Sequence, residues 1–187
     1  MDAASYLQVP PSGEVKIMPM ATKLSQTYVP VEDRLLLISQ DDQGHVYRLW
    51  LTQRIATDVV LALTGWLENQ PESPLEAACG PVAQVWQQAA AVMQYMPAIP
   101  VGADMSAPPA ATEGLVQNVE LIRGDEAYVL VLSLASGASL TLPFNPTELR
   151  QWLSLLHGLY ETSGWPLTAW PAWFKRPLAT AAPNTVN

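Results

Sequence analysis

The sequence has very few of the side chains that usually carry chemistry. It contains one cysteine, Cys79, and two histidines, His45 and His157. A single cysteine excludes an internal disulfide, which fits a reducing compartment. Neither histidine stands at metal-ligand spacing from a second histidine, a cysteine or a paired carboxylate. We therefore expect no metal, no cofactor and no catalytic residue, and a protein that is not an enzyme. An enzyme of unknown class is the least favoured alternative.

Positive charge and long hydrophobic runs are also scarce. The chain has 9 Lys and Arg against 17 Asp and Glu, a net charge of −8. Such a chain is repelled by phosphate backbones, which disfavours a nucleic-acid partner. The most apolar helical window, residues 55–67, is interrupted by Asp58 and is too short to cross a bilayer. Residues 1–5 lack the features of a secretory signal, so we expect a cytoplasmic protein with no membrane contact.

Two smaller features could carry chemistry but have simpler explanations. Cys79 precedes Gly80 near a helix break and could be a reactive thiol, although a half-buried small hydrophobic residue is the stronger interpretation. The pair Asp41-Asp42 could hold a cation, although acidic residues between two strands usually form the turn.

Hydrophobic residues, in contrast, make up 49% of the chain, and their spacing predicts regular structure. Residues 34–40 and 45–52 read as two strands joined by a tight turn at 41–44. A helix then starts after Thr52 and runs to about Glu68. Its stripe of Ile55, Val59, Leu63 and Leu67 predicts the face that packs on the sheet.

The same strand–turn–strand–helix pattern recurs 93 residues later without a gap. Gly44 falls on Gly137, the helix cap Thr52 falls on Asn145, and Leu63 falls on Leu156. A third strand precedes each hairpin, at residues 24–29 and 117–122. We therefore predict an α+β fold of two three-stranded units, each followed by a helix, with an extra helical segment between them. Chance similarity of two hairpin–helix units is the alternative.

This repeat suggests a division of the chain. Residues 1–96 would hold the first unit and its connecting helix, and residues 97–114 a linker rich in proline and alanine. Residues 115–178 would hold the second unit and a tryptophan-rich strap, and residues 179–187 a disordered tail. Asn145-Pro146-Thr147-Glu148 is the clearest helix start, and Gly164 is the predicted stop.

The tryptophan-rich segment is the first candidate site. Trp165, Trp170, Trp173 and Phe174 lie within ten residues and cannot all face water without cost. Pro166 and Pro171 predict an extended segment with at least one exposed tryptophan. We take these four residues as partner-binding, and predict a non-catalytic protein-interaction or assembly protein that also uses an exposed sheet face. Its partner would be another protein or a second copy of the chain. An intramolecular strap over the core is the alternative.

The second candidate site is a basic-aromatic cluster of Arg34, Arg48, Trp50 and Arg54. It could bind single-stranded nucleic acid or an acidic peptide by stacking and charge. The simpler interpretation pairs Arg34 with Glu32 or Asp33 and packs Trp50 under the middle helix. In element order alone, residues 24–68 and 117–161 resemble the PUR-repeat and whirly families. That resemblance implies single-stranded nucleic-acid binding as the alternative function, from which the acidic balance of this chain departs.

Overall fold

The computed structural model describes residues 19–69, 80–94, 112–123 and 127–175. These residues form an α+β fold with a six-stranded mixed sheet and four α-helices. The strands are β1 (Ala21–Val29), β2 (Arg34–Asp41), β3 (Val46–Leu51), β4 (Thr112–Arg123), β5 (Tyr128–Leu134) and β6 (Ser139–Phe144). The helices are α1 (Gln53–Glu68), α3 (Pro81–Met93), α4 (Pro146–Ser163) and α5 (Ala172–Lys175), with a 3-10 turn, η1 (Leu167–Ala169), before α5.

The sheet consists of two antiparallel three-strand meanders joined in the middle. Its strand order is β1-β2-β3-β4-β5-β6, and only the β3–β4 pair is parallel, from Tyr47 opposite Thr112 to Trp50 opposite Leu115. Residues 112–114, which we predicted to be linker, already form the start of β4. Cys79, residues 97–111 of the predicted linker and the predicted tail 179–187 lie outside the described residues.

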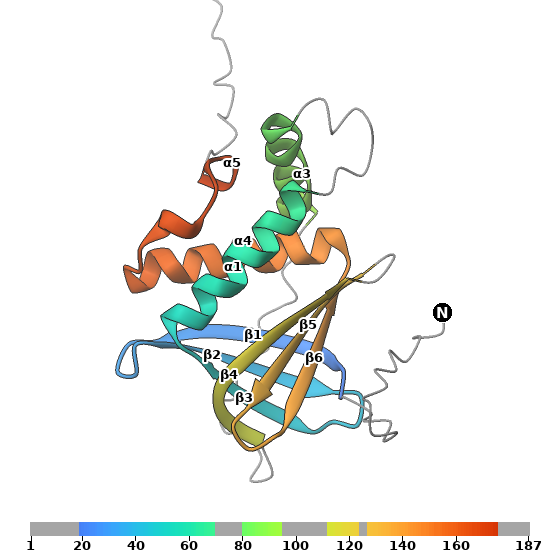
Figure 1. Ribbon diagram of the computed structural model, residues 1–187, viewed down its shortest axis with the longest axis vertical. Coiled ribbons are helices and arrows are strands. Elements are labelled where there is room, and N and C mark those ends of the chain that lie inside the picture. The colour runs from blue at the N-terminus through green and yellow to red at the C-terminus, as the bar shows by residue number, and fades with distance from the viewer. Residues whose placement is uncertain (1–18, 70–79, 95–111, 124–126, 176–187) are drawn as a thin grey trace, which may run out of the picture.

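The first and last strands of the sheet approach each other. Met20, just before β1, forms a parallel bridge with Thr141 of β6, and the Thr141 N–H donates to Pro19 O at 2.9 Å. The sheet is therefore strongly curled, with the helices gathered at one end of it (Figure 1). Apart from this bridge, β1 and β6 share no strand pairing among the described residues, and we call the space between them the seam.

The two hairpins have the same register. In the first, Leu35 lies opposite Leu51, and in the second Tyr128 lies opposite Phe144, each 93 positions later. Both turns contain a glycine with positive φ, 83° at Gly44 and 82° at Gly137. Only glycine adopts this conformation without steric cost, so both glycines are required by the turns.

The first strand of each unit departs from the ungapped alignment. Each has a bulge, between Ala21 and Lys23 in β1 and between Val116 and Asn118 in β4. These positions are 95 residues apart, whereas the hairpins and helices are 93 apart. The predicted match of residues 24–29 with 117–122 is therefore wrong by two positions, because a turn length differs between the units.

The two long helices begin and end as their sequences predict. Thr52 caps α1, with its Oγ1 accepting from Ile55 N at 3.3 Å. Asn145 and Glu148 form a reciprocal capping box at the start of α4, with both hydrogen bonds at 2.9 Å. Gly164, with φ of 72°, ends α4. The predicted caps and stop are confirmed because each depends on only a few neighbouring residues.

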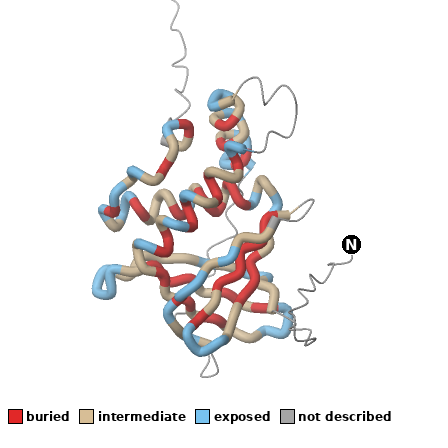
Figure 2. The backbone as a smooth tube through the Cα atoms, viewed as in Figure 1, coloured by how far each residue is buried: buried red, intermediate tan, exposed pale blue. Residues whose placement is uncertain are grey.

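The core lies between the inner face of the sheet and the helices. Leu63 of α1 and Leu156 of α4 are both buried in it, as predicted. Buried positions line the inner sides of α1 and α4 (Figure 2). Among the described residues, no helix is long and apolar enough to cross a membrane.

Candidate functional site

The tryptophan-rich segment is part of the protein's own core. Trp165, Trp170 and Trp173 are each at most 6% exposed, and Phe174 packs against the same core. The prediction of an exposed tryptophan is therefore wrong. The predicted extended shape is also wrong: η1 and α5 form here, because Pro166 and Pro171 stand just before these turns, where a proline is tolerated.

Hydrogen bonds hold this segment, residues 165–174, which we call the C-terminal strap. The Trp165 Nε1–H donates to Asp33 Oδ1 at 2.8 Å, and the Trp173 Nε1–H donates to Glu68 Oε1 at 2.6 Å. Asp33 lies in the β1–β2 turn, with φ of 47°, and Glu68 lies in the last turn of α1. The strap thus packs on α4 and links the β1–β2 turn to the last turn of α1.

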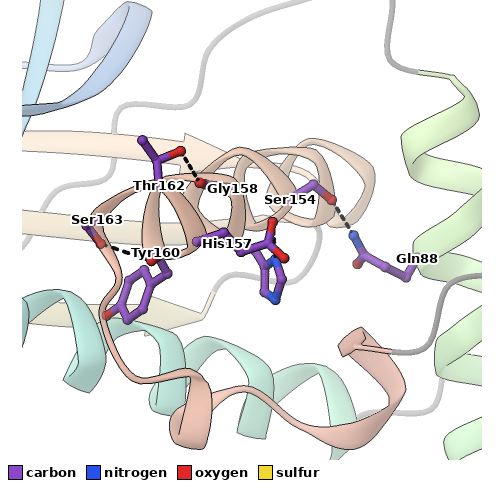
Figure 3. A network of polar contacts seen from close by, with 8 residues as sticks. Gln88, Ser154, His157, Gly158, Tyr160, Thr162 and Ser163 are labelled. Atoms are coloured by element: carbon purple, nitrogen blue, oxygen red, sulfur yellow. Dashed lines mark hydrogen bonds and ion pairs between the residues drawn. The ribbon is translucent and has the colours of Figure 1, made fainter.

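Ring contacts complete the strap. Trp170 meets His157 and Tyr160 of α4 edge-on, with ring centroids 4.8 and 5.5 Å apart. His157 and Tyr160 lie on the side of α4 that faces the strap (Figure 3). The Arg150 guanidinium lies 5.7 Å from the centre of the Trp173 ring. The four residues that we predicted to bind a partner are Trp165, Trp170, Trp173 and Phe174. They therefore make most of their contacts within the chain.

Asp33 is the polar centre at one end of the strap. Its Oδ1 also accepts from the Tyr28 hydroxyl at 2.8 Å. These two hydrogen bonds lower the pKa of Asp33, and the one from Trp165 has the larger effect. The hydrogen bond to the Asp33 carboxylate raises the pKa of Tyr28 in return.

The basic-aromatic cluster does not form a free positive surface. Arg48 Nε lies 3.3 Å from Glu113 Oε2, and the Trp50 Nε1–H donates to Glu113 Oε1 at 2.8 Å. Arg34 lies 3.7 Å from Glu32, as the simpler interpretation predicted. Arg54 is exposed on α1. The Glu113 carboxylate on β4 thus binds both Arg48 and Trp50, the two residues that a nucleic acid would need most.

A polar group at the β2–β3 turn has a structural role. Asp41 Oδ1 accepts from the backbone N–H of Gln43 and of His45, so Asp41 is the turn former that its position suggested. His45 Nε2 and Thr112 Oγ1 are 2.7 Å apart and join this turn to β4. Burial, followed by the charge of Asp41, raises the pKa of Tyr47.

The seam between β1 and β6 holds a pocket of about 390 Å³. Its lining is mainly apolar, and its polar residues are Thr22, Lys23, Asn145 and Glu148, the last two of which already form the α4 cap. Pro143 of β6 lines it as well and has no N–H to offer to another strand. Proline and lysine on edge strands are devices that prevent strand addition. The seam is therefore protected against an extended peptide.

Helix α3 has its polar side inside and its apolar side outside. Gln84, Gln88 and Ala91 are its buried residues. On the opposite side, Trp86 is 64% exposed and Met93 is 83% exposed. Buried and exposed positions alternate along this helix in Figure 2. This is the reverse of a normal surface helix, whose apolar stripe faces the core.

Hydrogen bonds explain why the glutamines of α3 are inside. The Gln84 amide donates to Leu67 O at the end of α1, at 2.7 Å. The Gln88 amide donates to Arg150 O at 3.0 Å and to Ser154 Oγ at 2.6 Å, both on α4. Figure 3 shows the contact with Ser154. Buried polar groups with partners are tolerated and fix one arrangement of the helices.

Arg150 connects this helix to the strap. It is buried, and its Nη2 donates to Gln84 Oε1 at 2.7 Å and to Gln87 Oε1 at 2.5 Å. The same guanidinium lies over Trp173. The strap, α4 and α3 are thereby held as one unit, with the outer side of α3 directed away from it.

Sequence reasoning missed the outer side of α3, although a signal was available. The sequence predicts a helix from about Val82 to Met96, with Val85, Ala89, Val92 and Met96 along one side, either packed closely within the chain or laid on a partner. Met96 lies outside the described residues. Val85 and Ala89 are half-buried, whereas Val92 is exposed. Four glutamines and no charged residue in residues 81–94 are the signal, because a solvent-facing helix normally carries charge.

No group of three or more metal-ligating side chains occurs in the described part of the chain. Comparison with protein-family models, with curated proteins and with solved structures finds no match to this chain.

Proposed function

We propose that this is a non-catalytic protein-interaction or assembly protein that docks through the outer face of α3. This outer face is defined by Val82, Trp86, Ala90 and Met93, with Ala83 and Ala89 at its margins. The observation that supports the proposal is the reversed polarity of α3, with glutamines buried and large apolar side chains exposed.

The spacing of the exposed residues makes the outer face continuous. Val82, Trp86 and Met93 are separated by four and seven positions, so they lie one above another along the helix. Burying a large apolar side chain stabilises a complex by roughly 1.5–3 kcal/mol. An exposed tryptophan near the middle of an apolar surface is also the residue type that most often dominates binding energy.

The C-terminal strap supports the proposed docking helix from behind. Trp173 contacts Arg150, and Arg150 donates to Gln84 on the inner side of α3. A docking surface on a helix held in one orientation loses less conformational entropy on binding than a mobile one. The aromatic residues that suggested an interaction protein would thus act indirectly, by positioning α3.

Site-specific photo-crosslinking tests the proposal. A photoreactive phenylalanine analogue replaces Trp86 in the full chain, and adducts are sought in extract of the native host. Val31 is the matched control, since it is an exposed apolar residue in the β1–β2 turn, far from α3 (Figure 1). We expect a discrete adduct from position 86 and none from position 31. Absence of an adduct at position 86, or equal labelling from both positions, would contradict the proposal.

We also propose that the two meander–helix units are a structural duplication. Support comes from the equal hairpin registers, the equal turn glycines and the bulge that each first strand carries. The test is an experimental structure in which residues 34–68 are superposed on residues 127–161. A different angle between hairpin and helix in the two units would remove this proposal.

The cytoplasm is the location that we propose with this function. The single cysteine of the chain supports it, because proteins of oxidising compartments commonly use paired cysteines. Cell fractionation tests this, and recovery in a membrane or secreted fraction would contradict it.

A further inference from the structure

We infer that the outer face of α3 binds a second copy of the same chain, through an antiparallel helix pair about a two-fold axis. This inference rests on the proposed function and specifies its partner. Three features of α3 carry it: its lack of charge, the alternation of large and small side chains along its outer face, and its length.

Charge favours contact through α3. The chain has a net charge of −8, so two copies repel each other wherever their acidic surfaces meet. Residues 81–93 contain no Asp, Glu, Lys, Arg or His. Two copies that meet along α3 therefore bring no like charges together at the centre of the contact. A different partner protein is usually selected by charges around the contact, and α3 itself offers none.

The side chains of the outer face fit a reversed copy of themselves. Trp86 and Met93 are seven positions apart, and the small residues Ala83 and Ala90 are also seven positions apart. When two such helices run antiparallel, Trp86 lies over Ala90 of the second copy and Met93 lies over Ala83. Each large side chain then meets a small one, as in well-packed helix pairs. A parallel pair would instead place Trp86 against Trp86.

The symmetry of this arrangement limits it to two copies. In a two-fold contact, the same surface is used on both sides, so every contact occurs twice and no surface is left for a third copy. A helix of 13 residues is about 20 Å long, which places the contact at the small end of specific interfaces. We therefore expect association in the micromolar range rather than a permanent dimer.

Sedimentation velocity of the purified full chain tests the inference. Concentrations would run from about 1 to 300 μM, around the expected micromolar dissociation constant. We expect the sedimentation coefficient to rise from that of a monomer to that of a dimer. Replacement of Trp86 by alanine should weaken dimerisation at least about tenfold. A chain that stays monomeric at the highest concentration, or a Trp86→Ala variant that dimerises like the wild type, would overturn the inference.

A compensating pair of substitutions tests the antiparallel arrangement. Ala90→Trp alone should abolish the dimer, because two tryptophans would then compete for one space. The double variant Trp86→Ala with Ala90→Trp should restore it, because each large residue again faces a small one. Circular dichroism should show all variants folded, since both positions are exposed. Failure of the double variant to dimerise would overturn this arrangement.

The crosslinking experiment separates this inference from the proposed function. An adduct of twice the 20.4 kDa chain mass from position 86 agrees with both. An adduct of any other mass, with a monomeric purified chain, supports the docking function and contradicts the second copy. No adduct together with a monomeric chain contradicts both.

Discussion

The indole Nε1–H of Trp173 donates to Glu68 Oε1 at 2.6 Å, across 105 positions of sequence. This bond joins the last turn of α1 to the short helix α5. The Trp173 ring is buried and also contacts Arg150, so one residue meets both α1 and α4. The strap is therefore a structural element of the folded chain, and its removal should affect stability before it affects binding.

Replacement of Trp173 by alanine should destabilise the chain by about 3–5 kcal/mol, because it removes a large buried side chain and leaves a cavity. The matched control is Trp86→Ala on the exposed side of α3, which should change the unfolding free energy of the monomer by about 0.5 kcal/mol or less. Urea unfolding, at a protein concentration low enough to favour the monomer, measures the unfolding free energy of both variants. Equal effects of the two substitutions would mean that the strap is not part of the core.

Accessibility of the strap tryptophans gives a second measurement. In the folded monomer, acrylamide should reach Trp86 readily and Trp165, Trp170 and Trp173 poorly, because Trp86 is exposed and the other three are buried. Replacement of Trp86 by phenylalanine should therefore reduce the quenching of the wild-type chain clearly. Strong quenching of a strap tryptophan in the folded monomer would contradict its burial. Raising the protein concentration should then protect Trp86 from acrylamide if the inferred dimer forms.

Acid should weaken the contact between the strap and the β1–β2 turn. The folded state lowers the pKa of Asp33, so its contribution to stability is present above its unfolded pKa of about 4. This contribution is lost as the pH falls through the lower folded pKa. When the free energy of unfolding is measured against pH, Asp33→Asn should therefore reduce its fall on the acid side, which is the acid limb of the curve. Asp58→Asn, at an exposed position of α1, is the control. An unchanged acid limb in Asp33→Asn would remove this role.

The helix faces can be tested with two buried leucines and one exposed leucine. Leu63→Ala and Leu156→Ala should each cost about 2–5 kcal/mol, since both side chains are buried in the core. Leu61→Ala, two positions from Leu63 but exposed on α1, should cost far less. Thermal or urea unfolding measures all three. Near-neutral results at Leu63 and Leu156 would mean that the core is packed differently.

Nucleic-acid binding should be absent or very weak, because Glu113 binds both Arg48 and Trp50. Titration of labelled single-stranded oligonucleotides at low salt is the assay. Binding that weakens with salt and is lost in the double variant Arg48→Ala with Arg54→Ala would show that the basic-aromatic cluster is a true site.

The sequence predicted the features that depend on a few neighbouring residues. The turn glycines Gly44 and Gly137, the caps Thr52 and Asn145, and the stop at Gly164 were all found where the sequence indicated. Each of these positions has its own conformational requirement, which needs no knowledge of distant parts of the chain. The α+β class follows from the same local signals.

Tertiary structure alone decided which surfaces are inside. The sequence shows seven tryptophans but cannot show that Asp33 and Glu68 receive the indole N–H groups of Trp165 and Trp173 from more than a hundred residues away. It also shows glutamines and apolar residues in α3 without revealing their partners. The Gln84 amide donates to Leu67 O and accepts from the Arg150 guanidinium, and the Gln88 amide donates to Ser154 Oγ. Burial depends on partners distant in sequence, and a polar side chain is stable inside only when those partners exist. For this reason, the turns, the caps and the two long helices could be predicted from the sequence, whereas only the folded chain shows that the strap is internal and that the apolar side of α3 faces outward.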